Sequence, residues 1–263
     1  HRGPRSELPP LLPGGRRAGP VMGAEAITAP GPSVDGGGAV TLVLDTATSR
    51  LVVGLADATD GRLLAADGEE AGHRHGQLLL PLLDRVLAAR GWAKTDIAGI
   101  IVGTGPGAFT GLRVGLATAA GIARALGRPI VGVPTGEAIV VAAAEVAGWA
   151  PAAVLLLLPA GPKDRVVVRL GGPPVLLPAG REPEVTPETV LVAVDLPGRA
   201  PAEALELGLR ATAPERLAGA LARLGRAAKP ATTGGSPIVP EPEYVTLPRG
   251  LTAVDGEVRL VRA

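Results

Sequence analysis

The sequence predicts an α/β protein built from mixed sheets flanked by helices and preceded by a disordered tail. Three observations lead to this expectation. Of the 263 residues, 46% are hydrophobic, which allows a sizeable core. Apolar runs of strand length alternate with helix-period patterns from Val40 onward. Residues 1–38 hold 9 Gly and 7 Pro without apolar periodicity, so we expect disorder over residues 1–39.

The composition excludes several classes of function. The chain has no cysteine and only three histidines, so disulfides, thiolate zinc sites, cysteine nucleophiles and an HExxH helix are ruled out. Four aromatic residues cannot build a base-stacking platform, and a net charge of +1 gives little attraction to nucleic acid. No apolar run reaches membrane-spanning length and no signal peptide is apparent, so we expect a cytoplasmic protein with no membrane partner.

The first half of the body, residues 40–149, is predicted to form one lobe. Residues 76–90 are expected to be helical because Leu79, Leu80, Leu83, Val86 and Leu87 recur at spacings of three and four. The remaining predicted elements are strands at 41–45, 50–56, 62–66, 98–102 and 129–133, and helices at 112–126 and 136–147. Three consecutive strands followed by alternating helices and strands is the order of the ribonuclease-H-like fold of actin-type ATPases. A Rossmann half would begin β-α-β.

The second half, residues 150–263, is predicted to form a smaller lobe. The expected elements are strands at 153–158, 165–170, 175–177 and 190–195, helices at 202–210 and 214–227, a loop at 230–240 and an extended segment at 243–247. The chain is therefore expected to have two lobes.

A glycine-rich segment between a strand and a helix is the first candidate for chemistry. It reads Gly103-Thr-Gly-Pro-Gly-Ala-Phe-Thr-Gly-Leu-Arg113. Glycine permits close approach, Thr110 could cap the helix, and Arg113 adds a cation near the helix N-terminus, so phosphate could bind there. The alternative is a tight turn without a ligand. The segment is no Walker A loop, and no acidic residue follows at the spacing of a dinucleotide site.

Three smaller features each leave two interpretations open. Asp45-Thr-Ala-Thr-Ser49 places a carboxylate and hydroxyls between two strands, either for phosphate and metal or as a self-satisfied turn. His73 and His75 precede a helix, but no ligand set completes a metal site, so a polar loop is favoured. Gly111, Gly115 and Ala119 share one helix face, which would let another helix approach, from this chain or from another.

Four segments together resemble the bacterial TsaB (YeaZ) family. They are Asp45-Thr-Ala-Thr-Ser49, His75-Gly-Gln-Leu-Leu-Leu-Pro81, Gly105-Pro-Gly-Ala-Phe-Thr-Gly-Leu-Arg-Val-Gly115 and Gly132-Val-Pro-Thr135. A fifth, Pro242 to Arg249, is similar to the family's C-terminal motif. The resemblance spans residues 40–249 and is strongest before residue 140.

The resemblance implies an actin-like, two-lobed accessory subunit rather than an enzyme. Its partner would be TsaD, which transfers threonylcarbamoyl to N6 of adenosine 37 in tRNA, with the ATPase TsaE joining them and tRNA contacted only indirectly. The subunit would have no cofactor of its own, with ATP or ADP at a shared interface, and a homodimer could use the same surface. The implied interface residues are Leu79, Leu83, Val86, Gly111, Gly115 and Ala119, and the candidate nucleotide residues are Asp45, Thr46, Gly105, Gly107, Thr110, Gly111 and Arg113.

Two departures bear on activity. TsaD-type enzymes carry metal-binding histidines at the position that here reads Val133-Pro-Thr-Gly-Glu-Ala-Ile139, so a TsaD-like metal site is not available and no metal is expected. The family's Asp in the segment corresponding to 159–165 is missing, and Ala108 and Pro134 replace family serines. The alternative function is a stand-alone actin-like ATP-dependent transferase or kinase, suggested by Asp45 and the glycine loop, with Asp195 at a strand end as the candidate catalytic acid.

Overall fold

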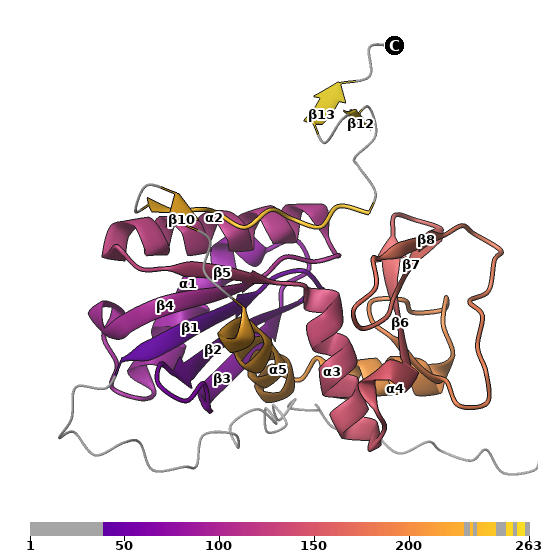
Figure 1. Cartoon of the computed structure of the whole chain (residues 1–263), viewed down its shortest axis with the longest axis horizontal. Coiled ribbons are helices and arrows are strands. Elements are labelled where there is room, and N and C mark those ends of the chain that lie inside the picture. The colour runs from indigo at the N-terminus through magenta and orange to yellow at the C-terminus, as the bar shows by residue number, and fades with distance from the viewer. Residues whose placement is uncertain (1–38, 229–231, 234–235, 246–250, 255–256, 261–263) are drawn as a thin grey trace, which may run out of the picture. The chain divides into compact units, whose positions relative to one another are not determined.

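The first sheet begins with an antiparallel meander. The computed structural model describes residues 39–228, 232–233, 236–245, 251–254 and 257–260, so the predicted tail lies almost wholly outside the described residues (Figure 1). Strands β1 (Val40–Asp45), β2 (Arg50–Asp57) and β3 (Leu63–Glu70) pair antiparallel, and β4 (Ile97–Gly103) and β5 (Ile130–Val133) extend the sheet in parallel. The strand order is β3-β2-β1-β4-β5, and the predicted three-strand start is confirmed.

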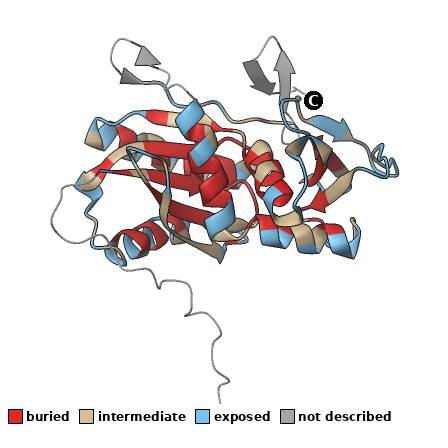
Figure 2. Ribbon diagram, turned by 60° about the horizontal axis from the view of Figure 1, so that its bottom comes forward, coloured by how far each residue is buried: buried red, intermediate tan, exposed pale blue. Residues whose placement is uncertain are grey.

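Helices cover both faces of this sheet because its strands are apolar on both sides (Figure 2). Leu42 and Leu44 share a buried cluster with α1 (His75–Ala88) and α2 (Phe109–Leu126). Val43 points the other way, into a cluster with α3 (Thr135–Ala147) and α5 (Pro214–Ala227). The sheet is therefore held between two helical layers.

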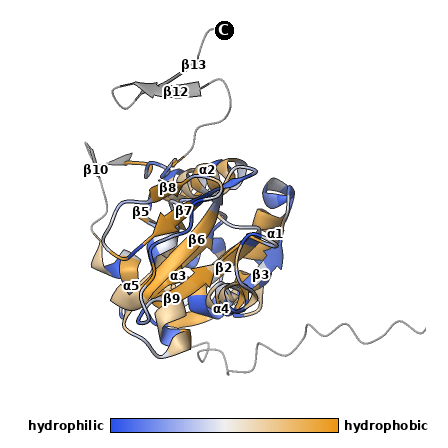
Figure 3. Ribbon diagram, turned by 90° about the vertical axis from the view of Figure 1, so that its right-hand side faces the viewer, coloured by the Kyte–Doolittle hydropathy of each residue, from blue (hydrophilic) through white to orange (hydrophobic). Residues whose placement is uncertain are grey.

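The second sheet has four strands in the order β8-β7-β6-β9. Its strands are β6 (Val154–Ala160), β7 (Asp164–Val168), β8 (Val175–Leu177) and β9 (Val190–Ala193). Only β6 and β9 pair in parallel. Figure 3 shows the hydrophobic β6, and α4 (Ala202–Ala211) packs on β9. Two mixed sheets flanked by helices confirm the predicted α/β, ribonuclease-H-like class.

Three details differ from the expectations. Helix α2 begins at Phe109 with Ala108 as its N-cap, so Thr110 lies in the first turn and is not the cap. Helix α5 belongs to the half of the chain after residue 149, which was expected to form the second lobe, but it packs on β2 and β3 of the first sheet. Short strands β10 (Thr232–Thr233) and β11 (Ser236–Pro237) pair inside the expected loop.

The end of the described chain also adds to the predicted elements. Strands β12 (Leu251–Val254) and β13 (Glu257–Leu260) form an antiparallel pair that the sequence did not predict. Residues 243–245 are not a strand, and the rest of the extended segment predicted at 243–247 lies outside the described residues. None of the helices in the described ranges is long and apolar enough to cross a membrane.

Candidate functional site

Asp45, the carboxylate that ends β1, is fully buried. Its Oδ2 accepts a hydrogen bond of 2.6 Å from Thr135 Oγ1, and its Oδ1 accepts one of 3.0 Å from the Ala47 amide. Burial raises the pKa of Asp45 to about 6, although the two hydrogen bonds act in the opposite direction. Asp45 therefore joins the end of β1 to the start of α3. Thr135 ends the Gly132-Val-Pro-Thr135 segment of the family resemblance, but the sequence gave its side chain no role in the site.

The glycine loop after β4 packs directly against the turn that follows Asp45. A Cβ atom on Gly103 would lie 1.9 Å from Asp45 Oδ2, and one on Gly107 would lie 2.0 Å from the Ala47 carbonyl oxygen. The Ala108 amide donates a hydrogen bond of 2.7 Å to that same Ala47 oxygen. No larger residue fits at either glycine without moving backbone or carboxylate atoms.

The first turns of α2 continue this close packing. A Cβ atom on Gly111 would lie 2.2 Å from the Thr46 carbonyl oxygen, and one on Gly115 would lie 2.2 Å from Thr46 Oγ1. Thr46 is buried and donates a hydrogen bond of 2.8 Å from Oγ1 to the Gly111 carbonyl oxygen. On the sides where their Cβ atoms would lie, these glycines are thus packed against the chain's own turn.

The other predicted phosphate residues are divided between the interior and the surface. Gly105 is buried with a φ of 103°, and its amide donates a hydrogen bond of 3.2 Å to Thr135 Oγ1. Thr110 is exposed. Arg113 is also exposed; its guanidinium carbon lies 4.0 Å from the Phe109 ring centroid, and its Nε donates a hydrogen bond of 3.1 Å to Tyr244 Oη. The predicted set therefore forms no single open cradle.

His75 supports the turn that follows β1, a role that the sequence did not predict. Its ring is buried, and its Nε2 lies 3.0 Å from the Thr48 carbonyl oxygen, which requires a proton on that nitrogen. His73 is exposed. Among the residues that the structure describes, no group of three or more His, Asp or Glu side chains is placed to hold a metal ion.

The residues predicted to face a partner are buried within this chain. Leu79, Leu83 and Val86 belong to the cluster between α1, α2 and the first sheet, as does Ala119. Gly111 and Gly115 face Thr46, as described above. The prediction that these six residues form a surface is therefore wrong, because the inner faces of both helices pack on the first sheet and on the turn at Thr46. On the outer face of α1, Leu80 is 50% exposed.

A cavity of about 620 Å³ lies beside the glycine loop and includes residues of both halves of the chain. Its walls are mainly apolar, and its only charged lining residues in the described part of the chain are Asp164 and Asp195. Phe109 and Tyr244 also line it, with ring centroids 5.0 Å apart. Two carboxylates and no lining cation disfavour a polyphosphate that brings no counterion.

This fold and site define an actin-like α/β protein whose glycine loop packs against its own turn after β1. The family model described as "TsaD: tRNA N6-adenosine threonylcarbamoyltransferase" matches residues 68–172. The chain is 38% identical over 94 residues to the tRNA threonylcarbamoyladenosine biosynthesis protein TsaB of Escherichia coli, covering 36% of this chain and 39% of that protein. The chain belongs to the TsaB (YeaZ) family.

Two further relatives complete the comparison. An uncharacterized protein of Mycobacterium leprae is 39% identical over 102 residues, or 38% of this chain and 28% of the relative. The solved structure of YeaZ from Pseudomonas aeruginosa is 31% identical, with a TM-score of 0.46 and coverage of 56% of this chain and 70% of that one. The chain spans less than half the length of the curated relatives it matches.

Proposed function

We propose that this chain takes part in forming threonylcarbamoyladenosine in tRNA, as a non-catalytic partner of a TsaD-type catalytic subunit. The observation that carries the proposal is the filled glycine loop, in which Gly103, Gly107 and Gly111 pack on the turn after β1. A loop used in this way stiffens the protein and gives helices α1 and α2 fixed positions. The similarity to the Escherichia coli tRNA threonylcarbamoyladenosine biosynthesis protein TsaB supports this choice of reaction.

The alternative, a stand-alone ATP-dependent transferase or kinase, needs an acid that is free to act in the cavity. Asp45 is fully buried and bound to Thr135. Asp195 reaches the cavity, but its two carboxylate oxygens accept hydrogen bonds from Ser49. These contacts favour the accessory role over the enzymatic one.

We place the partner surface on the outer faces of α1 and α2, which contact each other along the first sheet. Leu80 provides a half-exposed apolar side chain on α1, and Ala117 and Gly121 are exposed four residues apart on α2. Small residues at this spacing allow a helix of another protein to approach closely. The same surface would serve a homodimer when the partner is absent.

The remaining parts of the proposal concern the wider assembly. A TsaE-like ATPase would join the complex, and tRNA would be bound mainly by the catalytic subunit. ATP or ADP would lie at an interface shared with a partner, since this chain's loop is filled. The assembly would work in the cytoplasm.

The test is association with a purified TsaD-type subunit of the same organism, measured by light scattering with and without ATP. The wild-type chain is expected to form a heterodimer. Leu80→Asp should weaken it by about tenfold or more, because a carboxylate would be buried against an apolar contact. Leu209→Asp on α4 is the matched control, because Leu209 is 57% exposed and lies on another helix. No association of a folded wild-type chain, or equal losses in both variants, would contradict the proposal.

A further inference from the structure

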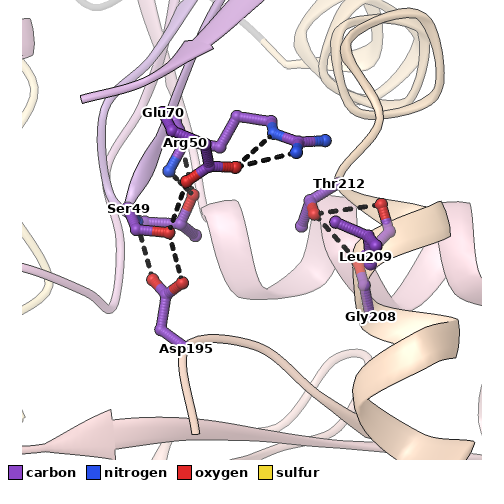
Figure 4. A network of polar contacts seen from close by, with 8 residues as sticks. Ser49, Arg50, Glu70, Asp195, Gly208, Leu209 and Thr212 are labelled. Atoms are coloured by element: carbon purple, nitrogen blue, oxygen red, sulfur yellow. Dashed lines mark hydrogen bonds and ion pairs between the residues drawn. The ribbon is translucent and has the colours of Figure 1, made fainter. Parts of the chain in front are cut away.

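Asp195, just after β9, is bound to Ser49, in the turn between β1 and β2. The Ser49 amide donates a hydrogen bond of 2.6 Å to Asp195 Oδ2, and Ser49 Oγ donates one of 2.5 Å to Asp195 Oδ1 (Figure 4). The two residues are 146 positions apart. A carboxylate that accepts both donors of one residue makes a two-point, charge-assisted joint between the strand ends of the two sheets.

The backbone of Asp195 is held in an uncommon conformation. Its φ is 57°, and no other non-glycine residue of the described ranges has a positive φ. Such a conformation costs on the order of 1 kcal/mol and persists where the surroundings enforce it. The paired bonds to Ser49 are the contact that this conformation makes possible.

A second acceptor for the Ser49 hydroxyl is already in place. Glu70 Oε2 lies 3.1 Å from Ser49 Oγ, and Glu70 is held by an ion pair of 2.7 Å with Arg50. One hydroxyl proton cannot serve two carboxylates fully, so Asp195 and Glu70 compete for it. Glu70 belongs to β3 of the first sheet, whereas Asp195 follows β9 of the second.

Asp195 also lines two cavities. It lines the 620 Å³ cavity beside the glycine loop and a smaller one of about 170 Å³. The smaller cavity is lined also by Ser49, Arg50, Glu70 and Thr212. The Ser49–Asp195 joint thus lies where both cavities have Asp195 in their walls.

We propose that Ser49 and Asp195 form a clasp that holds the two sheets together beside the large cavity, with Glu70 as the acceptor that stabilises Ser49 when the clasp opens. In the closed state the Ser49 hydroxyl donates to Asp195. In the open state it donates to Glu70, so the half-buried hydroxyl has a carboxylate partner in both states. The clasp is an element with two arrangements and does not depend on the accessory role.

The absence of cysteine makes the opening directly measurable. Thr110→Cys and Lys163→Cys add two exposed labelling sites, next to the cavity-lining residues Phe109 and Pro162. Nitroxide labels on this pair report the distance across the cavity by pulsed electron paramagnetic resonance. The labelled parent is expected to give one narrow distance distribution.

The principal variant is Asp195→Gly, because glycine accepts the positive φ and removes both acceptor oxygens. The distance between the two labels should then become longer in most molecules. Hydrogen exchange of the Ser49 amide should accelerate by about tenfold or more. Ser49→Ala removes the hydroxyl but keeps the hydrogen bond from the backbone amide of residue 49 to Asp195. The distance between the labels should therefore shift in the same direction by a smaller amount.

Two further variants make the test specific. Glu70→Ala removes the open-state acceptor and should keep the distribution as narrow as in the parent. Asp164→Asn is the matched control, because Asp164 lines the same cavity but accepts a hydrogen bond from the Ala179 amide instead of from Ser49. An unchanged distance distribution in both Asp195→Gly and Ser49→Ala would overturn the clasp, as would an equal shift in Asp164→Asn.

Discussion

Glycines serve different purposes on the two sides of the large cavity. In the loop after β4, Gly107 has no space for a Cβ atom because the Ala47 backbone lies 2.0 Å from where it would be. In the turn between β6 and β7, Gly161 has nothing within 4 Å, but its φ is 77°. Glycine is required at position 107 by close packing and at position 161 by the backbone conformation. A glycine-rich loop therefore does not by itself indicate a phosphate site.

The largest expected effect comes from filling the packed side. Gly107→Ala would force a methyl group onto the Ala47 carbonyl, and we expect a loss of about 3 kcal/mol or more in the free energy of unfolding. Urea unfolding followed by circular dichroism measures this loss. The control is Gly121→Ala in α2, where nothing lies within 4 Å and alanine should add about 0.5–1 kcal/mol. A loss under about 1 kcal/mol in Gly107→Ala would show that the loop has room.

A slightly smaller effect should appear in the pH dependence of stability. The folded-state pKa of Asp45 is about 6 against an ordinary 3.8, so between these values the folded state binds more protons than the unfolded state. This group therefore stabilises the wild type fully at low pH, and that contribution is lost as pH rises through about 6.

The variant that isolates this effect is Asp45→Asn, which cannot ionise. Between about pH 4 and pH 7, the wild type should lose about 3 kcal/mol relative to the variant, measured by urea unfolding at each pH. A difference between the two proteins that does not change with pH would mean that Asp45 is not buried as described.

The smallest effect belongs to the open side of the cavity. Gly161→Ala should cost only about 1–2 kcal/mol, because the strain is confined to one left-handed residue with free space around it. The same urea titration measures it. A cost equal to that of Gly107→Ala would remove the distinction between the two sides.

The order of elements in this chain could be read from its sequence because it depends on local patterns. The periodic leucines of α1 and the apolar run of β6 define their elements without tertiary information. The start of α2 was placed at Leu112 rather than Phe109, because Ala108 provides no capping side chain as a signal. The pair β10–β11 is too short to show a pattern.

The site was harder to predict because its contacts join distant residues. The sequence indicated both Asp45 and the glycine loop, but not that the turn after Asp45 fills the loop, a contact between residues 65 positions apart in the case of Thr46 and Gly111. The spacing of Gly111, Gly115 and Ala119 identified a packing face without naming its partner, which is internal. The bond between Ser49 and Asp195 has no local signal.

In the proposed function, the motif around Asp45 maintains the fold while the outer face of α1 binds the partner. The most direct test compares Leu80→Asp and Asp45→Asn for association with the TsaD-type subunit by light scattering, at a pH where both variants are folded. We predict that Leu80→Asp loses association while Asp45→Asn retains it. Loss of association in Asp45→Asn together with its retention in Leu80→Asp would contradict the account.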